Sequence, residues 1–226
     1  MATTTIPWGD GSGDNIYLTY SSASGDQTVE VSSDANTGNA RTKVVTFTAG
    51  NATQTLTVNQ ERGPQQHTLT KYPSSIDTVN TVVSSWSSSY PASNGYTSAT
   101  SSTEARANLV TGSRAETFVY WKFDLSSIPD DATIDSVELK VKAISQASSV
   151  TPTSYLVVCD GTTQKGSVSN TTNSLQTYTL DTGSGWTGAS IKNLSLLFYS
   201  KRGTSSVNSN YALRFFGATL TIKYTA

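Results

Sequence analysis

The chain has 226 residues, with 15 Lys and Arg against 16 Asp and Glu, so its net charge is −1 when the single His is neutral. Without a basic run there is little to attract a phosphate backbone, and we expect no nucleic-acid partner. One His and one Cys cannot form a Cys/His zinc site or an internal disulfide. No apolar stretch approaches the roughly 20 residues of a transmembrane helix, so we expect no membrane partner.

The composition favours β-structure. Ser and Thr together number 71, and charged residues make up only 14% of the chain, against roughly a quarter in ordinary domains. Helix formers are scarce, whereas β-branched and aromatic residues, which suit a pleated and half-buried surface, are common. The sequence therefore predicts an all-β fold.

Residues 14–60 predict four strands, because apolar and polar residues alternate there. Gly50-Asn51 fits the turn of a two-residue hairpin between the last two strands. A domain of about 60 residues is marginal alone, so we expect residues 1–62 to gain stability by burying surface against a partner. The first residues lack the pattern of a secretory signal, and residues 1–14 predict an extended arm that becomes ordered on docking. The apolar positions of the four strands are Ile16, Leu18 and Tyr20, then Val29 and Val31, then Val45 and Phe47, then Leu56 and Val58.

A linker is predicted next. Residues 61–66 are polar, lack an apolar period and contain the Gly63-Pro64 pair, which marks a break between elements. We place the linker at residues 63–67, and the second domain then covers residues 68–226.

Short strands separated by turn signals predict a larger β-sandwich of jelly-roll type in the second domain. Residues 84–103 are rich in Ser and predict either a long loop or irregular strands. Asp130-Asp131 predicts a solvated turn. From residue 116 onward the strands are clear. The first places Val119, Trp121, Phe123 and Leu125 on one face, and the next does so with Val137, Leu139, Val141 and Ala143. Later strands are predicted around residues 155–158, 175–180, 194–198 and 216–224.

The N-terminal domain resembles an immunoglobulin-like module of the BACON type. The resemblance depends on Val31-Ser-Ser-Asp-Ala-Asn36, Arg41-Thr-Lys43, Val45-Thr-Phe47 and Leu56-Thr-Val-Asn-Gln60, together with Trp8-Gly-Asp-Gly-Ser12. It implies a small sandwich of the kind found in Bacteroidetes proteins and their phages.

The second domain resembles β-sandwiches of tailed-phage head fibres and other virion proteins. The residues concerned are Phe123-Asp-Leu-Ser-Ser-Ile-Pro-Asp-Asp-Ala-Thr-Ile134, Ser136–Lys142 and the closing run Arg214–Tyr224. Similar runs occur in bacterial surface proteins and carbohydrate-active proteins. The resemblance implies an architecture and no chemistry.

No catalytic, cofactor or metal residues are predicted. His67 is the one conventional base and lies at the predicted linker, and no nucleophile elbow occurs. There is no Asp-x-Asp-x-Asp loop, although a calcium site built from scattered loop oxygens stays open. Cys159 follows an apolar run and predicts a small buried side chain.

Aromatic residues supply the candidate binding sites. Trp86, Tyr90, Tyr96 and Trp186 lie in polar surroundings, and they either stack on sugar rings or pack under loops. Ile6 and Trp8 are candidates for an attachment surface on the N-terminal domain.

These features predict a non-enzymatic virion protein, a head fibre or capsid decoration protein of a tailed phage. The N-terminal domain would attach to other capsid proteins, and the second domain would be displayed outward toward host or mucus glycans. We expect a homo-oligomer, a trimer by preference, assembled in the host cytoplasm and released by lysis. The alternative is a carbohydrate-binding accessory module of a bacterial surface protein. A glycan-active enzyme is a further alternative, without a visible catalytic constellation.

Overall fold

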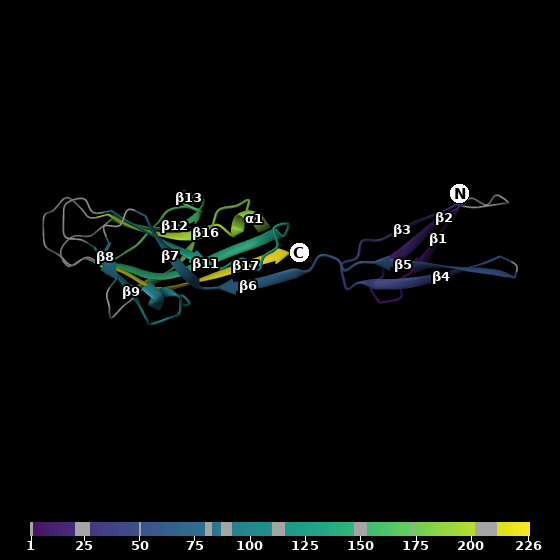
Figure 1. Cartoon of the computed structure of the whole chain (residues 1–226), viewed down its shortest axis with the longest axis horizontal. Coiled ribbons are helices and arrows are strands. Elements are labelled where there is room, and N and C mark those ends of the chain that lie inside the picture. Colours follow the sequence, from purple (N-terminus) through teal and green to yellow (C-terminus); the bar gives the residue numbers. More distant parts are fainter. Residues whose placement is uncertain are drawn as a thin grey trace. The chain divides into compact units, whose positions relative to one another are not determined.

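The computed structural model describes residues 2–20, 28–49, 51–79, 83–86, 92–109, 116–146, 153–172, 174–201 and 212–226 (Figure 1). These residues are almost entirely antiparallel β-structure, which confirms the all-β prediction. The chain divides into two compact units, Met1–Gln65 and Gln66–Ala226, each of which is described by itself. No helix in these ranges is long and apolar enough to cross a membrane.

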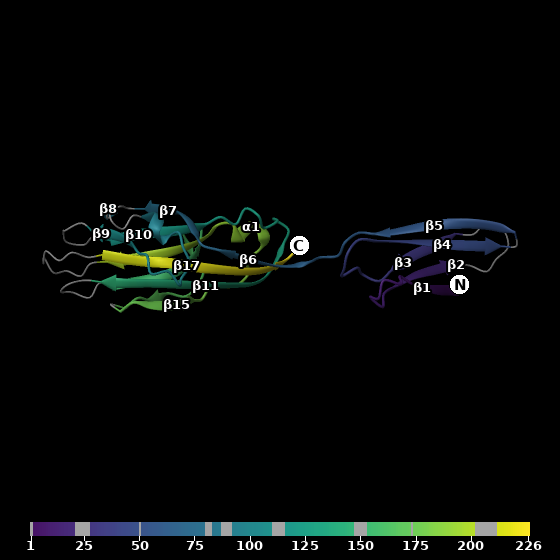
Figure 2. The same cartoon turned by 90° about the horizontal axis from the view of Figure 1, so that it is seen from below.

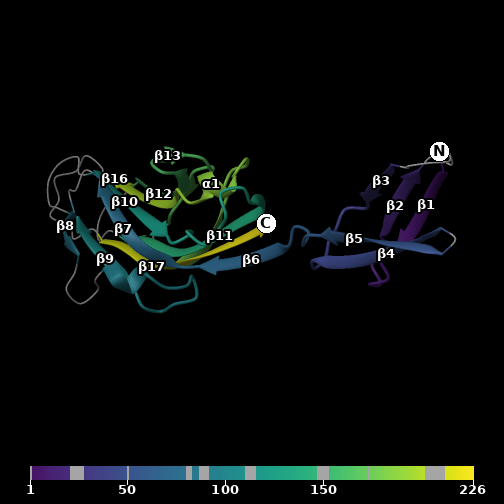
Figure 3. The ribbon, with the colours of Figure 1, turned by 45° about the vertical axis from the view of Figure 1, so that its right-hand side comes forward.

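The first unit is a small sandwich of two sheets. β1 (Ala2–Pro7), β2 (Asn15–Tyr20) and β3 (Val29–Ser33) form one sheet in that order, and β4 (Arg41–Ala49) and β5 (Ala52–Gln60) form the other. The four strands predicted within residues 14–60 are confirmed. The extended arm predicted for residues 1–14 is wrong, since β1 pairs with β2 along its whole length, from Ala2↔Tyr20 to Pro7↔Asn15. The two sheets cross at an angle (Figure 3).

The core of the first unit is small. Its buried members are Trp8, Ile16, Leu18 and Val45. Ile6, Val29, Phe47, Leu56 and Val58 pack around them and are only half buried. The period-2 pattern thus identified those of these residues that lie in β2 to β5, whereas Tyr20 and Val31, which it also assigned to the apolar positions, are exposed (36% and 39%).

The connection between the units lies two residues earlier than predicted, at residues 61–65. β6 (Gln66–Lys71) begins at Gln66 and pairs with the last strand, with His67 opposite Tyr224. Gln66 and His67 therefore belong to a sheet and not to a linker over residues 63–67. Gly63 is required by packing, because a Cβ there would lie 1.7 Å from the carbonyl oxygen of Asn36.

The second unit is a sandwich of two six-stranded antiparallel sheets. One sheet has the order β13-β12-β16-β10-β7, with β14 on β12, and the other has the order β15-β11-β17-β9-β8, with β6 on β17. The remaining bounds are β7 (Pro73–Val79), β8 (Val83–Trp86), η1 (Ala92–Gly95), β9 (Ala105–Leu109), β10 (Glu116–Phe123), β11 (Thr133–Gln146), β12 (Thr153–Asp160), β13 (Thr163–Gln164), β14 (Ser169–Asn170), β15 (Gln176–Leu180), α1 (Gly188–Ile191), β16 (Leu194–Lys201) and β17 (Ala212–Thr225).

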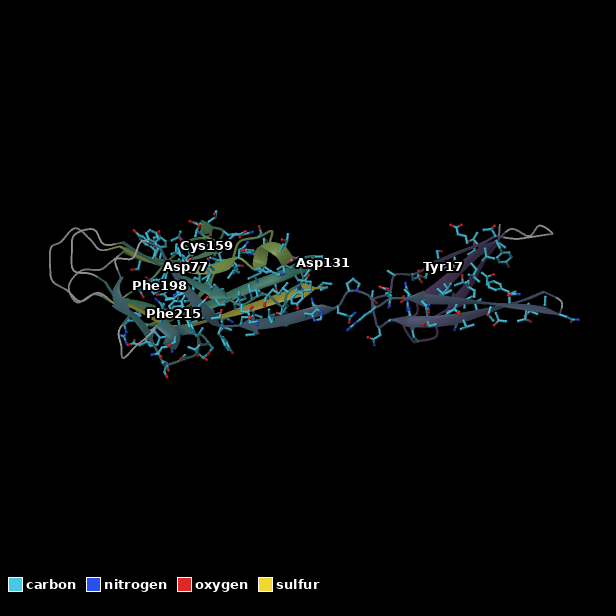
Figure 4. The ribbon with its side chains drawn as sticks, viewed as in Figure 1. Tyr17, Asp77, Asp131, Cys159, Phe198 and Phe215 are labelled. Atoms are coloured by element: carbon cyan, nitrogen blue, oxygen red, sulfur yellow. The ribbon has the colours of Figure 1, made fainter. Side chains whose placement is uncertain are left out.

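The core of the second unit lies between these sheets. Val119, Trp121 and Phe123 of β10 are buried on one face, and so are Leu139 and Val141 of β11, which confirms both predicted strands. Phe198 and Phe215 enter the same core from β16 and β17 (Figure 4).

The corner between β10 and β11 is a solvated turn, as predicted. The Ala132 N–H donates to the carbonyl oxygen of Pro129 (3.2 Å) and closes the turn. Asp130 and Asp131 are exposed, and Lys192 forms an ion pair with Asp130. The adjacent carboxylates therefore keep the turn in water.

Candidate functional site

An arginine holds one end of the first unit together. Three glycines with φ between 78° and 86° let the loop after Trp8 curl tightly, which brings Asp10 and Asp14 to Arg41. The guanidinium Nη1 lies 2.9 Å from Asp10 Oδ2, and Nη2 lies 3.0 Å from Asp14 Oδ2. Its Cζ lies 4.5 Å from the centre of the Trp8 ring, and Nε donates to Gln60 Oε1 (2.9 Å).

A buried asparagine continues this packed end. Asn36 donates to the carbonyl oxygens of Asn39 (2.9 Å) and Glu61 (2.5 Å), and its own side-chain oxygen accepts from the Gly38 N–H (2.9 Å). Asn36, Arg41 and Gln60, which belong to the segments that resemble the BACON module, therefore make their hydrogen bonds within the first unit. These contacts give this end of the unit a structural role.

Asp10 is held in its charged form. The Ser12 hydroxyl donates to Oδ1 (2.6 Å), and Arg41 donates to Oδ2 (2.9 Å). These hydrogen bonds, that of Ser12 first, hold the pKa of Asp10 far below its usual range.

We expect the first unit to lose stability as the pH decreases below about 4, the pKa of an unfolded Asp. A carboxylate whose pKa is lower in the folded state stabilises the fold above its unfolded pKa, and this stabilisation is lost as the pH falls. Asp10→Asn should make the stability of the first unit depend less on pH. The indole resonance of Trp8 in the full chain, followed during thermal unfolding at several pH values, measures it; an unchanged slope in the variant would contradict the expectation.

An open apolar cleft lies at the other end of the first unit, where β2 and β4 finish. Its volume is about 500 Å³. All five strands contribute to its lining, which consists of Thr4, Ile6, Leu18, Tyr20, Val29, Val45, Thr46, Phe47, Thr48, Ala52 and Gln54.

The cleft carries no charged side chain among these lining residues. Leu18 and Val45 form its buried floor, at 2% and 7% exposure, while Phe47 and Val29 are half buried. Hydroxyl and amide groups, such as those of Thr4 and Gln54, stand at its exposed rim. An apolar cavity with a few neutral polar groups favours an uncharged ligand.

The predicted attachment residues divide between core and cleft. Ile6 lines the cleft and is half buried. Trp8 is only 5% exposed and packs inside its own unit under Arg41. Trp8 is therefore not an exposed anchor, and this prediction is corrected: its partners come from strands far along the sequence, which the local apolar context did not reveal.

Of the four residues predicted to contact glycans, the two whose side chains the structure describes, Tyr96 and Trp186, form no open surface. Trp186 is 7% exposed, donates to the Thr182 carbonyl oxygen (2.9 Å) and has Lys165 Nζ 3.9 Å from its ring centre. Tyr96 is half buried with its ring edge-on to Trp121, at 6.1 Å between centres. These two side chains serve the core. Trp86 ends β8 opposite Ala107, and Tyr90 lies outside the described residues.

A second apolar cluster covers the outer face of the sheet that contains β10, β12 and β16. Tyr155 stacks on Tyr199 (4.3 Å between centres), and Phe118 lies 5.0 Å from the same ring. Cys159 of this cluster is buried (Figure 4), which raises the pKa of its thiol to about 11 and keeps it neutral. At 7–8% exposure, Tyr120, Tyr199 and Leu197 offer no open platform.

A metal-binding group is not found in the described part of the chain. Its His, Cys, Asp and Glu residues form no group of three or more that could hold a metal ion. His67 is exposed and stacks on Tyr224, with 5.1 Å between ring centres.

The comparison with protein families matches the first unit. Residues 8–61 match the BACON family, described as "Putative binding domain, N-terminal". No curated protein and no solved structure matches the chain. The match covers the Arg41 network and most of the cleft, so the first unit is the part of this chain that is similar to the BACON binding domains.

Proposed function

We propose that the chain is a non-catalytic attachment protein whose first unit binds its partner through the apolar cleft. The observation that carries the proposal is a charge-free cleft of about 500 Å³ within the unit that matches a family of binding domains. Such a cleft exposes apolar surface to water, which favours a ligand that covers it.

The cleft replaces Trp8 as the attachment surface. Phe47 and Ile6 are half buried at its walls, so a ligand could bury their remaining surface. Val44 lies on the outer face of the same strand and is 56% exposed. A substitution of Phe47 therefore tests the cleft, and the same substitution of Val44, outside the cleft, is its control.

Binding of the uncharged dye Nile red to the full chain tests the cleft. We expect dye fluorescence to increase with the natural chain and with Val44→Lys, and to fall about tenfold with Phe47→Lys, because a charge cannot be buried in an apolar cavity without a partner. Equal fluorescence for all three proteins would contradict the proposal.

The non-catalytic part of the proposal is tested separately. A panel of plant and host glycans incubated with the chain should show no turnover.

The finer role proposed is that of a virion protein, a head fibre or capsid decoration protein of a tailed phage. It is supported by the sequence resemblance of residues 123–142 and 214–224, and the cleft would hold the protein on the particle. Purified particles should then contain the chain, and Phe47→Lys should reduce its copy number. Absence of the chain from particles would exclude this role.

The second candidate is a carbohydrate-binding module of a bacterial surface protein. The neutral Thr and Gln rim of the cleft favours it, since hydroxyl and amide groups can bind sugar hydroxyls. Saturable binding of a neutral oligosaccharide that Gln54→Lys abolishes and Val44→Lys preserves would support this candidate over protein attachment.

A further inference from the structure

The two sheets of the first unit have unequal numbers of strands, three against two. Lys43 of β4 donates to the Trp8 carbonyl oxygen (3.3 Å), next to the end of β1, whereas Gln60 of β5 donates to Ser33 Oγ of β3 (3.2 Å). β4 is thus the strand of the hairpin on the β1 side (Figure 2). Within the described residues β4 pairs only with β5. The edge of β4 that has no paired strand therefore faces the β1 side.

The cleft follows that edge of β4. Four consecutive residues, 45–48, line it. Side chains alternate between the two faces of a strand, so Val45 and Phe47 enter the cleft while Thr46 and Thr48 border it along the strand edge. Across the cleft, Thr4 is exposed and Ile6 half buried although both line it. The inner surface of β1 is therefore not fully covered by the two-stranded sheet.

The backbone at this edge favours one class of ligand. Every second residue of an edge strand directs its N–H and C=O groups away from its one neighbour. Such a row of groups is a template for a further strand. A sugar or a lipid cannot match donors and acceptors at the spacing of a strand, whereas an extended peptide can pair with them and place alternate side chains in the adjacent cleft.

We propose that the free edge of β4 accepts an extended peptide strand of a partner protein, which becomes the third strand of the smaller sheet. This deepens the proposed function and depends on it. Apolar side chains at every second position of the partner strand would enter the cleft against Leu18 and Phe47. These side chains are uncharged, because no charged residue lines the cleft to pair with them.

We assign the strand to a different protein, because β4 of a second copy carries Arg41 and Lys43 on the same face as Phe47, and no charged residue lines the cleft to pair with them. The uncharged strand β1 is the closest match within the chain, but all six of its residues already pair with β2. Releasing β1 would also disturb Trp8, which follows it directly and is 5% exposed. Strand exchange between copies would therefore cost part of the core of each copy.

The test uses a labelled synthetic peptide of alternating Val and Thr, with a terminal Lys pair for solubility, and fluorescence anisotropy with the full chain. We expect saturable binding that Phe47→Lys weakens at least about tenfold and Val44→Lys leaves within about twofold. Replacing a central Thr of the peptide by Pro should also weaken binding about tenfold, since Pro cannot donate to a strand ladder. Hydrogen exchange should slow at the β4 amides of the complex.

Controls separate this proposal from the proposed function. The Trp8 indole resonance shows whether Phe47→Lys folds, and Gln54→Lys, at an exposed lining residue, replaces it if it does not. Nile red binding in the cleft without peptide binding would overturn the strand proposal and leave the cleft as a binding site. Failure of both ligands would overturn both. Equal binding of the Pro peptide, or a dimer of the natural chain that Phe47→Lys dissociates, would also overturn the partner strand.

Discussion

Replacing Trp8 by Ala should unfold the first unit and leave the second unit folded. Among the described residues, Trp8 is the largest side chain in a core with three other buried members, and it also carries the Arg41 guanidinium over its ring. Truncating a buried Trp costs about 3–5 kcal/mol. A domain of about 60 residues has a total stability of roughly 3–9 kcal/mol, so the loss removes most of it.

Urea unfolding of the full chain, followed by hydrogen exchange in β2 and in β11, measures the two units separately. The exchange protection of Ile16 and Leu18 should collapse in Trp8→Ala, while that of Leu139 persists, since Leu139 belongs to the core of the second unit. Val44→Ala, at an exposed position, is the matched control. A folded first unit that loses only partner binding would restore Trp8 as an anchor.

The sequence predicted those strands in which apolar and polar residues alternate. Period-2 alternation located β2 to β5 and the long strands β10 and β11, and the same pattern identified Trp121 as a core residue. β1 escaped prediction because it contains Thr3, Thr4 and Thr5 with a single half-buried residue, Ile6. A strand at a sheet edge with both faces largely in solvent has no hydrophobic alternation to detect.

The cleft could not be predicted from the same pattern. Alternation shows that Val45 and Phe47 share a face, but not how completely the opposite sheet covers that face. Coverage depends on the strand count of each sheet and on the angle at which they cross, both of which are properties of the tertiary structure. The sequence signal for a binding site was instead sought in Trp and Tyr residues, two of which, Tyr96 and Trp186, belong to the core.

The second apolar cluster, on the outer face of the sheet with β10, did have a signal in the sequence. Residues 118–121 are Phe-Val-Tyr-Trp, so β10 is apolar on both faces, and a strand of this kind is buried on both sides. Only the face with Val119 and Trp121 was used in the prediction. The Tyr120 face forms the outer cluster with Tyr155 and Tyr199, whose positions on β12 and β16 follow from the strand order and not from any local pattern.

The aromatic centre of the second unit predicts the second large effect. Trp121 is 1% exposed and stacks on Phe215 with 4.0 Å between ring centres and 17° between planes. Tyr96 meets its ring edge-on. A Cβ at Gly95 would lie 2.5 Å from Trp121 Cη2, so the segment around η1 also packs against the indole. Trp121 thus contacts both sheets of the second unit and the segment around η1.

Trp121→Ala should therefore destabilise the second unit by about 3–5 kcal/mol, and Trp121→Phe by less, because Phe keeps a ring against Phe215. Urea unfolding read by hydrogen exchange at Leu139 and Leu220 measures this, with the first unit as an internal reference. Tyr72→Ala, at a residue 47% exposed, should change stability by less than about 0.5 kcal/mol. A loss below about 1 kcal/mol for Trp121→Ala would mean that the segment around η1 collapses into the cavity, and Gly95→Ala would then be tolerated in the same background.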